Sequence, residues 1–443
     1  MNLPATLVAA RAALDSGELT SAALLEAVLE RSAVHEPAIR SLVTATVDLA
    51  REHAAKADAR LAAGESGPLL GIPVVLKDLI DVAGLVTTAG SRVLEKNVAH
   101  TNATVWSRLE QAGAVLVGKA NTHEFAYGGT TEPTRNPANP ERIVGGSSGG
   151  PAAALAAGLC LGAVGTDTAG SIRIPANLCG VAGLKPTRGL VPTDGIVPLS
   201  PTLDVAGPMA RSVADLDPLL RVLAGLAGGP TPQRVPRTVG VLAGLGRSAA
   251  SVDVAVSSAA DAFGDLGARV MEVRLPGIEA SVGDNFTIIG HEASRFHARW
   301  ANRADLYTPY VRARLAAAAL VTDGQYDAAR ASGMAFSDEL DQLLDTVEVL
   351  LLPGVPFPAS PAYDEQVQVA GEWEDRDTAL CRNTAFANLA GHPVLAIPAG
   401  LDEGLPVGVQ LVGRRGSDLD LIAIGASLEP LLPDGLPPHL RSL

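Results

Sequence analysis

Two short loops rich in glycine and serine hold the residues of this chain that could carry out chemistry. Residues 145–150 have the sequence Gly-Gly-Ser-Ser-Gly-Gly, and residues 165–173 include Thr168, Ser171 and Arg173. Small residues leave hydroxyls and backbone N–H groups open to a substrate, where larger side chains would block its approach. A flexible linker is the ordinary interpretation of the first loop taken alone. A phosphate-binding loop is disfavoured because no Gly-x-x-x-x-Gly-Lys-[Ser/Thr] pattern occurs.

A lysine precedes these loops at the end of an apolar run. Residues 72–76 predict a buried strand that places Lys77 at its carboxyl end, where ligands collect in open α/β sheets. Taken alone, Lys77 would be expected to form a surface salt bridge with Asp78. The two serine-containing loops downstream instead favour a catalytic role for this lysine.

The three segments, in this order, resemble the signature of the amidase signature family of serine hydrolases. They are residues 71–78, 145–150 and 165–176, and the resemblance extends over residues 69–214, with a weaker match over residues 383–413. It implies a Ser–Ser–Lys triad with Ser171 as nucleophile, Ser147 as a bridging serine held by a cis peptide, and Lys77 as base. It also implies an oxyanion hole made by the backbone N–H groups of Thr168, Ala169, Gly170 and Ser171, and substrate-binding residues Phe125, Ala126, Tyr127 and Ser147.

This triad would supply what amide hydrolysis needs, namely a nucleophile, a proton path to the leaving amine and donors for the oxyanion. Lys77 must be neutral to accept a proton, so its pKa must fall from about 10.4 towards neutrality, and burial could lower it. Ser147 would relay the proton from Ser171 to Lys77 and later protonate the departing nitrogen. The remaining acyl-Ser171 would be cleaved by water.

Other polar residues near the loops are assigned structural roles. His123 is expected to be a hydrogen-bonded loop residue and Cys179 a buried filler, because neither has the partners that catalysis would require. Ser148 and Asp167 are expected to brace the loops, and a structural role is favoured for Arg173 over contact with the substrate. Residues 131–137 are several residues shorter than the family pattern, which shortens a loop near the site.

The resemblance implies an α/β fold with a large mixed, mostly parallel central sheet covered by helices on both faces. We expect a single compact catalytic domain with an N-terminal helical segment (1–65), a signature core (66–225) and a C-terminal part of the same sheet (235–443). Residues 219–236, rich in glycine and proline, are the best candidate for a linker. Helices over 290–303 and 310–344 would form an outer layer, and a proline-rich loop ending at Tyr363 would cover the mouth of the site.

Composition excludes several classes of protein. The chain has 443 residues, of which 47% are hydrophobic, and its net charge of −14 disfavours direct nucleic-acid binding. Three cysteines without Cys-x-x-Cys spacing indicate neither a disulfide framework nor a zinc site, and we expect no metal or other cofactor. We read no secretory signal and no membrane span, so we expect a cytoplasmic protein.

The leading hypothesis is a stand-alone amidohydrolase that converts a small or medium carboxamide into a carboxylate plus ammonia or an amine. One alternative is a glutamine-hydrolysing amidotransferase A-type subunit, although residues 310–330 lack the glutamine-recognising pattern we would expect and the chain is short for that subfamily. Another is a urea- or biuret-type amide hydrolase subunit that needs a small partner. A non-catalytic binding protein is disfavoured because all three triad residues are present, and the hypothesis allows a homodimer.

Overall fold

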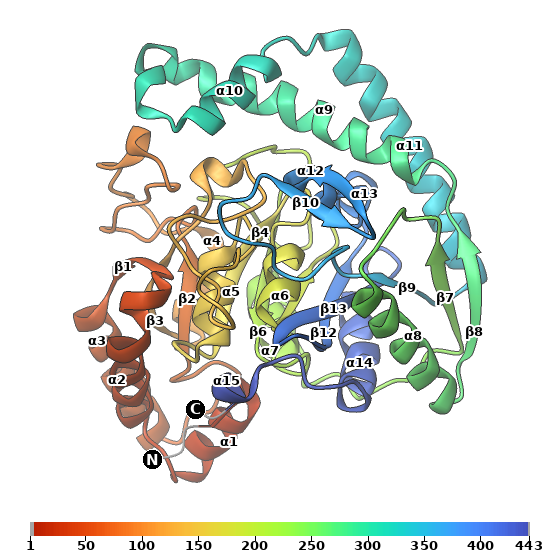
Figure 1. Cartoon of the computed structure of the whole chain (residues 1–443). Helices are drawn as coiled ribbons and strands as arrows, with labels where there is room; N and C mark the ends of the chain where they lie inside the picture. Colours follow the sequence, from red (N-terminus) through yellow and green to blue (C-terminus); the bar gives the residue numbers. More distant parts are fainter. Residues whose placement is uncertain (1–3, 442–443) are drawn as a thin grey trace.

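Eleven strands form one sheet in the computed structural model, which describes residues 4–441 (Figure 1). The strand order is β1-β3-β2-β4-β6-β5-β12-β13-β9-β7-β8. The strands are β1 (Leu42–Ala45), β2 (Pro73–Lys77), β3 (Val115–Ala120), β4 (Gly162–Asp167), β5 (Ala182–Lys185), β6 (Val205–Ala210), β7 (Thr238–Ala243), β8 (Arg269–Arg274), β9 (Val349–Pro353), β12 (Val394–Asp402) and β13 (Leu405–Val412). A separate hairpin pairs β10 (Gln366–Val369) with β11 (Glu372–Asp375).

The sheet is mixed, as predicted, but parallel pairs are not in the majority. Within the described strands, four of the ten neighbouring pairs of this sheet are parallel and six are antiparallel. The prediction erred because an antiparallel strand covered on both faces shows the same unbroken apolar run as a parallel one. The tight turn at Glu403 and Gly404, both with positive φ, also forces β12 and β13 to run antiparallel.

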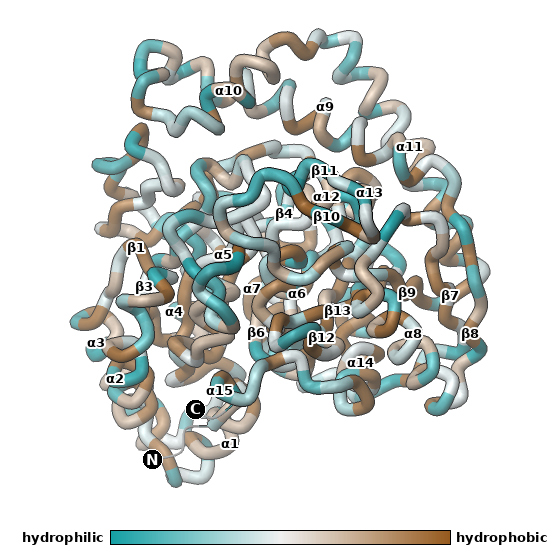
Figure 2. The backbone as a smooth tube through the Cα atoms, in the orientation of Figure 1, coloured by the Kyte–Doolittle hydropathy of each residue, from teal (hydrophilic) through white to brown (hydrophobic). Residues whose placement is uncertain are grey.

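Helices cover both faces of the sheet, as predicted. Side chains of a strand alternate between faces, and accordingly Val74 and Leu76 join one apolar cluster while Val75 joins another. The first cluster includes residues of α1 (Leu7–Ser16), α4 (Thr104–Gln111), α7 (Leu216–Ala224), α8 (Ala250–Asp265) and α14 (Asp418–Leu428). The second includes residues of α2 (Ser21–Ile39), α3 (Val47–Ala62), α5 (Gly149–Ala156) and α6 (Arg173–Cys179). Figure 2 shows hydrophobic colouring concentrated along the central strands.

A helical arm packs over one end of the molecule, along the top of Figure 1. It comprises α9 (Ile278–His297), the irregular 3-10 segment η3 (Ala298–Leu306), α10 (Pro309–Ala318) and α11 (Asp323–Thr346). The outer layer was predicted, but α9 begins twelve residues before the expected start at 290. A capping box at Thr322 and Gln325 starts α11, so the expected helix over 310–344 is two helices.

The expected linker over 219–236 is partly helical. Helix α7 continues to Ala224 and buries Leu219, Leu220 and Leu223 against the sheet, so only the later residues form an irregular connection. The glycines and prolines that suggested a linker follow this amphipathic helix. Both 66–225 and 235–443 contribute strands to the one sheet, and the proposed division into parts remains a prediction.

Shorter helices complete the described chain: η1 (Arg92–Leu94), η2 (Glu124–Ala126), α12 (Arg376–Cys381), α13 (Ala385–Ala390), η4 (Glu429–Leu431) and α15 (Pro438–Arg441). Across residues 4–441, no helix combines the length and the apolar character that a membrane crossing requires.

Candidate active site

Lys77 lies at the carboxyl end of β2 and is fully buried. Its Nζ donates hydrogen bonds to Ser147 Oγ at 2.7 Å and to Thr166 Oγ1 at 2.8 Å. Strand β4 runs parallel beside β2, with Val164 opposite Leu76, and this register brings Thr166 to the lysine. Within residues 4–441, no carboxylate lies within 4.0 Å of Lys77 Nζ. The alternative surface salt bridge with Asp78 is therefore wrong.

Burial lowers the pKa of Lys77 from its usual 10.5 to about 7, although the charges of Asp167 and Asp204 act in the opposite direction. A shift of this size disfavours the ammonium form by roughly 5 kcal/mol. The lysine can thus be neutral near pH 7 and accept a proton from the Ser147 hydroxyl.

Ser147 sits in the glycine-rich loop that leads into α5. The Gly146–Ser147 peptide bond is cis, as the resemblance implied. Gly146 is needed here because a Cβ on it would lie 2.8 Å from the backbone of Thr130. Thr131 Oγ1 donates to Ser147 O at 3.2 Å and accepts from Gly149 N–H at 3.1 Å, so the shortened segment 131–137 begins with a residue that braces this loop.

Ser171 follows β4 and lies on the wall of a cavity, where it is 8% exposed. The N–H of Ser148 donates to Ser171 O at 3.0 Å, which ties the two loops together. The two hydroxyls of Ser147 and Ser171 do not hydrogen-bond to each other in the described part of the chain. Catalytic hydrogen bonds often tighten only when substrate is bound, so the free geometry is compatible with a relay.

Asp167 braces the nucleophile loop. It accepts hydrogen bonds from the N–H groups of Gly170 at 2.9 Å and Ile172 at 3.1 Å. The N–H of Gly170 is therefore already occupied, which weakens its predicted place in the oxyanion hole. The backbone N–H groups of Thr168, Ala169 and Ser171 form none of the hydrogen bonds found within residues 4–441. Gly170 has φ 128° and a Cβ there would lie 2.3 Å from Thr384 Oγ1, so its role is to allow the turn.

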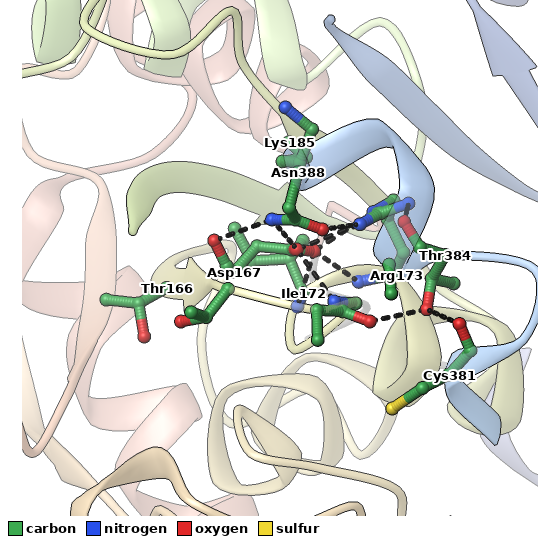
Figure 3. A network of polar contacts seen from close by, with 12 residues as sticks. Thr166, Asp167, Ile172, Arg173, Lys185, Cys381, Thr384 and Asn388 are labelled. Atoms are coloured by element: carbon green, nitrogen blue, oxygen red, sulfur yellow. Dashed lines mark hydrogen bonds and ion pairs between the residues drawn. The ribbon is translucent and has the colours of Figure 1, made fainter. Parts of the chain in front are cut away.

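A buried ion pair fixes Asp167 itself (Figure 3). Arg173 Nη2 and Nε bond the two carboxylate oxygens at 2.9 and 3.0 Å, and Asn388 Nδ2 donates to Asp167 Oδ1 at 2.8 Å. Burial alone would raise the pKa of Asp167, but the charge and hydrogen bonds of Arg173, helped by Lys185 and Asn388, hold it well below its usual range. The predicted structural roles of Asp167 and Arg173 agree with this geometry.

Asp204 supports the loop from its other side. Its carboxylate accepts from Thr168 Oγ1 at 2.6 Å and from the N–H groups of Leu199 and Ser200 at 2.9 and 3.1 Å. Burial raises the pKa of Asp204 to about 6, against the effect of these hydrogen bonds. Thr168, a predicted oxyanion-hole residue, is thereby held by a carboxylate that lies 36 positions later in the chain.

A cavity of about 740 Å³ opens in front of Ser171. Such a volume accommodates a drug-sized ligand. Its walls include residues of the nucleophile loop, of α9 and of the segment 374–382, which spans the end of β11 and α12. The lining includes the apolar residues Ile174, Leu199, Leu245, Ile278, Val282, Phe286 and Ile289 and the charged residues Glu279, Arg314, Glu374, Asp377 and Arg382.

The predicted pocket residues divide between two places. Ala126 and Tyr127 line the cavity, whereas Ser147 is buried behind it. Phe125 lies outside the cavity, because its backbone adopts a positive φ of 49° and its ring packs edge-on against His297, 4.4 Å between centroids. A turn of this kind could not be anticipated from the sequence pattern, since left-handed phenylalanine is rare.

The proline-rich loop ending at Tyr363 does not line the cavity. Its apolar side chains Val355, Phe357 and Ala359 are buried in the core, and residues 374–382 lie at the cavity instead. Prolines with alternating apolar side chains in this loop serve packing. His123 contacts the carbonyl of Glu124 at 3.3 Å as a loop residue, and Cys179 is buried, which raises the pKa of its thiol.

Sequence reasoning missed Thr166, Asp204 and Asn388. Thr166 was within reach, because it lies near the carboxyl end of the strand that leads to Ser171, at the sheet edge where the carboxyl ends of parallel strands meet. Asp204 and Asn388 meet the loop only through tertiary folding, and no local spacing marks them. Within the described residues, no group of three or more His, Cys, Asp or Glu side chains could hold a metal ion.

Comparison with known proteins gives consistent matches along the chain. The family model described as Amidase matches residues 23–422. The A-type subunit of glutamyl-tRNA(Gln) amidotransferase from Roseiflexus sp. (strain RS-1) is 39% identical over 469 residues, covering 95% of each chain. A solved amidase is 37% identical with a TM-score of 0.91, covering 96% of this chain and 100% of that one. A chain from a vestigial protein complex that reveals the evolutionary origins of an s-triazine catabolic enzyme is 32% identical with a TM-score of 0.90, covering 96% and 98%.

Proposed function

Because this chain belongs to the amidase family and is therefore an amide-cleaving enzyme, we propose that it hydrolyses a carboxamide through an acyl-Ser171 intermediate. The observation that carries this proposal is the buried lysine whose only polar partners in the described chain are two hydroxyls, Ser147 and Thr166. A lysine held in this way can act as a base, and Ser171 lies on the cavity wall in the loop tied to that of Ser147.

In the proposed mechanism, Ser171 Oγ attacks the carbonyl carbon while its proton passes to Ser147 and the Ser147 proton passes to neutral Lys77. The backbone N–H groups of Thr168, Ala169 and Ser171 stabilise the oxyanion. Ser147 then protonates the leaving nitrogen and regains a proton from Lys77. Water attacks the acyl-Ser171 along the same relay, which releases the carboxylate and restores the enzyme.

The volume of the cavity favours a substrate larger than the smallest amides. The apolar residues of α9 that line the cavity would accept the hydrocarbon part of an acyl group or amine. Charged residues also line the cavity, beside these apolar ones. We therefore propose a stand-alone amidohydrolase for a small or medium carboxamide as the first candidate.

A second candidate is supported by the Roseiflexus relative, whose name describes one subunit of an amidotransferase. In that case the chain would hydrolyse glutamine and deliver ammonia to a partner. A hydrolase subunit with a small partner is the third candidate, supported by the similar chain from the s-triazine-related complex. A homodimer and a cytoplasmic location remain proposals; the location rests on Cys160, Cys179 and Cys381, which are all free and buried.

The test begins with Ser171→Ala in the purified full chain, assayed for ammonia release from a panel of carboxamides that includes glutamine. We expect no turnover and an unchanged thermal melt, because only one hydroxyl is lost. Ser148→Ala is the matched control, since its hydroxyl bonds only the backbone of Thr166 and its loss should leave most of the activity. Near-normal turnover by Ser171→Ala would refute the assignment.

Two further measurements separate the candidates. Hydroxylamine added during turnover should divert the acyl group to a hydroxamate, which reports the acyl-serine directly. Activity of the purified chain on simple carboxamides supports the stand-alone enzyme. Activity that appears only with a co-purifying second polypeptide supports one of the two candidates that need a partner.

A further inference from the structure

A second cavity, of about 410 Å³, lies between the core and helix α11. It shares no lining residue with the cavity in front of Ser171. Three arginines from distant parts of the chain line it: Arg188 from the loop after β5, Arg330 from α11, and Arg415 from the loop after β13. These cations converge at one place in a protein whose net charge is −14.

Two of these guanidinium groups form no direct ion pair in the described part of the chain. Within residues 4–441, no Asp or Glu oxygen lies within 4.0 Å of Arg188 or Arg330. Arg188 donates only to the main-chain carbonyls of Thr202, Asn388 and Leu389, at 3.2–3.4 Å. Arg330 donates to Tyr326 Oη at 3.1 Å, and that hydroxyl donates to Glu292 Oε1 at 2.8 Å. The hydrogen bond to Tyr326 and the more distant charges of Glu292 and Asp327 raise the pKa of Arg330. Their remaining N–H groups are available to a ligand.

The third arginine is paired, so the cavity is not uniformly cationic. Arg415 forms an ion pair with Asp341 and donates to Ser337 Oγ at 2.9 Å. One further carboxylate, Asp338, lines the cavity. Burial, and to a smaller extent the positive charges of Arg415 and Arg330, lower the pKa of Arg188, as expected for like charges held close together. A bound anion would relieve that repulsion.

We propose that this arginine cavity is a binding site for a phosphate dianion, either free or carried by a small phosphorylated molecule. The guanidinium fork matches phosphate oxygens in a bidentate geometry. Two unpaired guanidinium groups balance a dianion better than a monocarboxylate. The volume is large enough for a phosphate with a small organic group attached.

Arg188 connects this site to the nucleophile loop. It bonds the carbonyl of Asn388, and the Asn388 amide bonds Asp167, which holds the N–H groups of Gly170 and Ile172. A ligand that draws Arg188 towards the cavity would therefore alter the contact of Arg188 with Asn388, the residue that bonds Asp167. Figure 3 shows Asn388 against Asp167 and Arg173. Phosphate should accordingly change the turnover number of the wild-type enzyme.

Binding is measured by titration calorimetry of the full chain with inorganic phosphate, pyrophosphate and a sugar phosphate, at an ionic strength held constant with sodium chloride. Wild-type protein should bind at least one of them saturably at millimolar concentrations or below. Arg330→Ala should weaken that binding about tenfold or more, since it removes a charge-assisted contact. Arg312→Ala, an exposed arginine of α10, is the charge-matched control and should bind as wild type does.

The choice among the three ligands identifies the source: tight binding of inorganic phosphate indicates the free ion, and preference for the sugar phosphate indicates a phosphorylated metabolite. Absence of saturable binding by wild type overturns the proposal. So does binding that Arg330→Ala leaves unchanged, or that Arg312→Ala weakens equally. These readouts do not use catalysis, so they stand apart from the proposed hydrolysis.

Discussion

Lys77 is the last residue of β2 and Lys119 the last but one of the neighbouring parallel strand β3, and both are fully buried, yet their partners differ in kind. Lys119 Nζ lies 2.8 Å from Asp78 Oδ1 and donates to Thr87 Oγ1 at 3.1 Å. Among residues 4–441, the polar partners of Lys77 Nζ are the hydroxyls of Ser147 and Thr166 alone. Because Lys119 stands opposite Leu76 in the register, the two lysines point to opposite faces of the sheet.

The comparison shows how one residue type serves structure on one face and chemistry on the other. A carboxylate balances the charge of Lys119, which makes an ion pair inside the protein. Hydroxyls give Lys77 no compensating charge, so burial can shift it to the neutral form. Lys185 adds a third case: burial also lowers its pKa to about 7, but its Nζ donates to Pro186 O at 2.9 Å and, in the described part of the chain, to no hydroxyl. A lysine with a lowered pKa can therefore act as a base only where its Nζ contacts a hydroxyl that relays a proton, as Lys77 contacts Ser147.

The largest expected effect is on activity in Lys77 variants. Lys77→Met and Lys77→Arg should each lose about a thousandfold or more in kcat/KM, because neither side chain can accept a proton. Steady-state rates with circular dichroism as a folding check decide this. An active, folded Lys77→Arg enzyme would remove Lys77 from the mechanism.

Lys77→Met also tests how the burial of Lys77 affects the pH dependence of the protein's stability. The folded-state pKa of Lys77, about 7, lies below its unfolded value of 10.5, so the unfolded chain binds more protons between these pH values. Wild-type stability should therefore rise with pH across this window relative to Lys77→Met. Thermal melts of both proteins from about pH 6.5 to about pH 9 measure the difference. A constant difference would mean that Lys77 stays charged in the folded protein.

Lys119→Met should mainly lower stability and leave activity almost unchanged, the opposite of the effect expected for the Lys77 variants. Removal of the ammonium leaves the buried Asp78 carboxylate without its ion pair, which should cost about 3–5 kcal/mol of unfolding free energy. The rate per folded molecule should change little. Denaturant titration measures the loss, and the double variant with Asp78→Asn should regain part of it. Equal stability of wild type and Lys119→Met would contradict the structural role.

A smaller effect is expected in the pH profile. Wild-type kcat/KM should fall about tenfold per unit as pH drops below about 7, since Lys77 must be neutral. The carboxylate of Asp204 raises the pKa of Lys77, so Asp204→Asn should move this acid limb to lower pH. Loss of activity without movement of the limb would show that Asp204 acts only through Thr168.

Much of the site could be predicted from local sequence. The spacing of small residues identified the loops of Ser147 and Ser171, and an apolar run identified the strand that ends at Lys77. These features are local: a strand needs a short apolar segment, and a tight loop needs glycine where a side chain would collide, as at Gly146. The short-range roles proposed for Asp167 and Ser148 agree with the structure for the same reason.

Only the tertiary structure decided which groups surround those residues. It paired Lys119 with Asp78, placed Thr166 and Asp204 around the loops, turned Phe125 away from the cavity and occupied the N–H of Gly170. It also decided the direction of the strands, because a run buried on both faces has the same composition in either orientation. The sequence by itself determined which side chains could react, since that depends on local residue types. Burial and charge partners depend on segments far apart in the chain, and these set the protonation of Lys77 and the shape of the cavity.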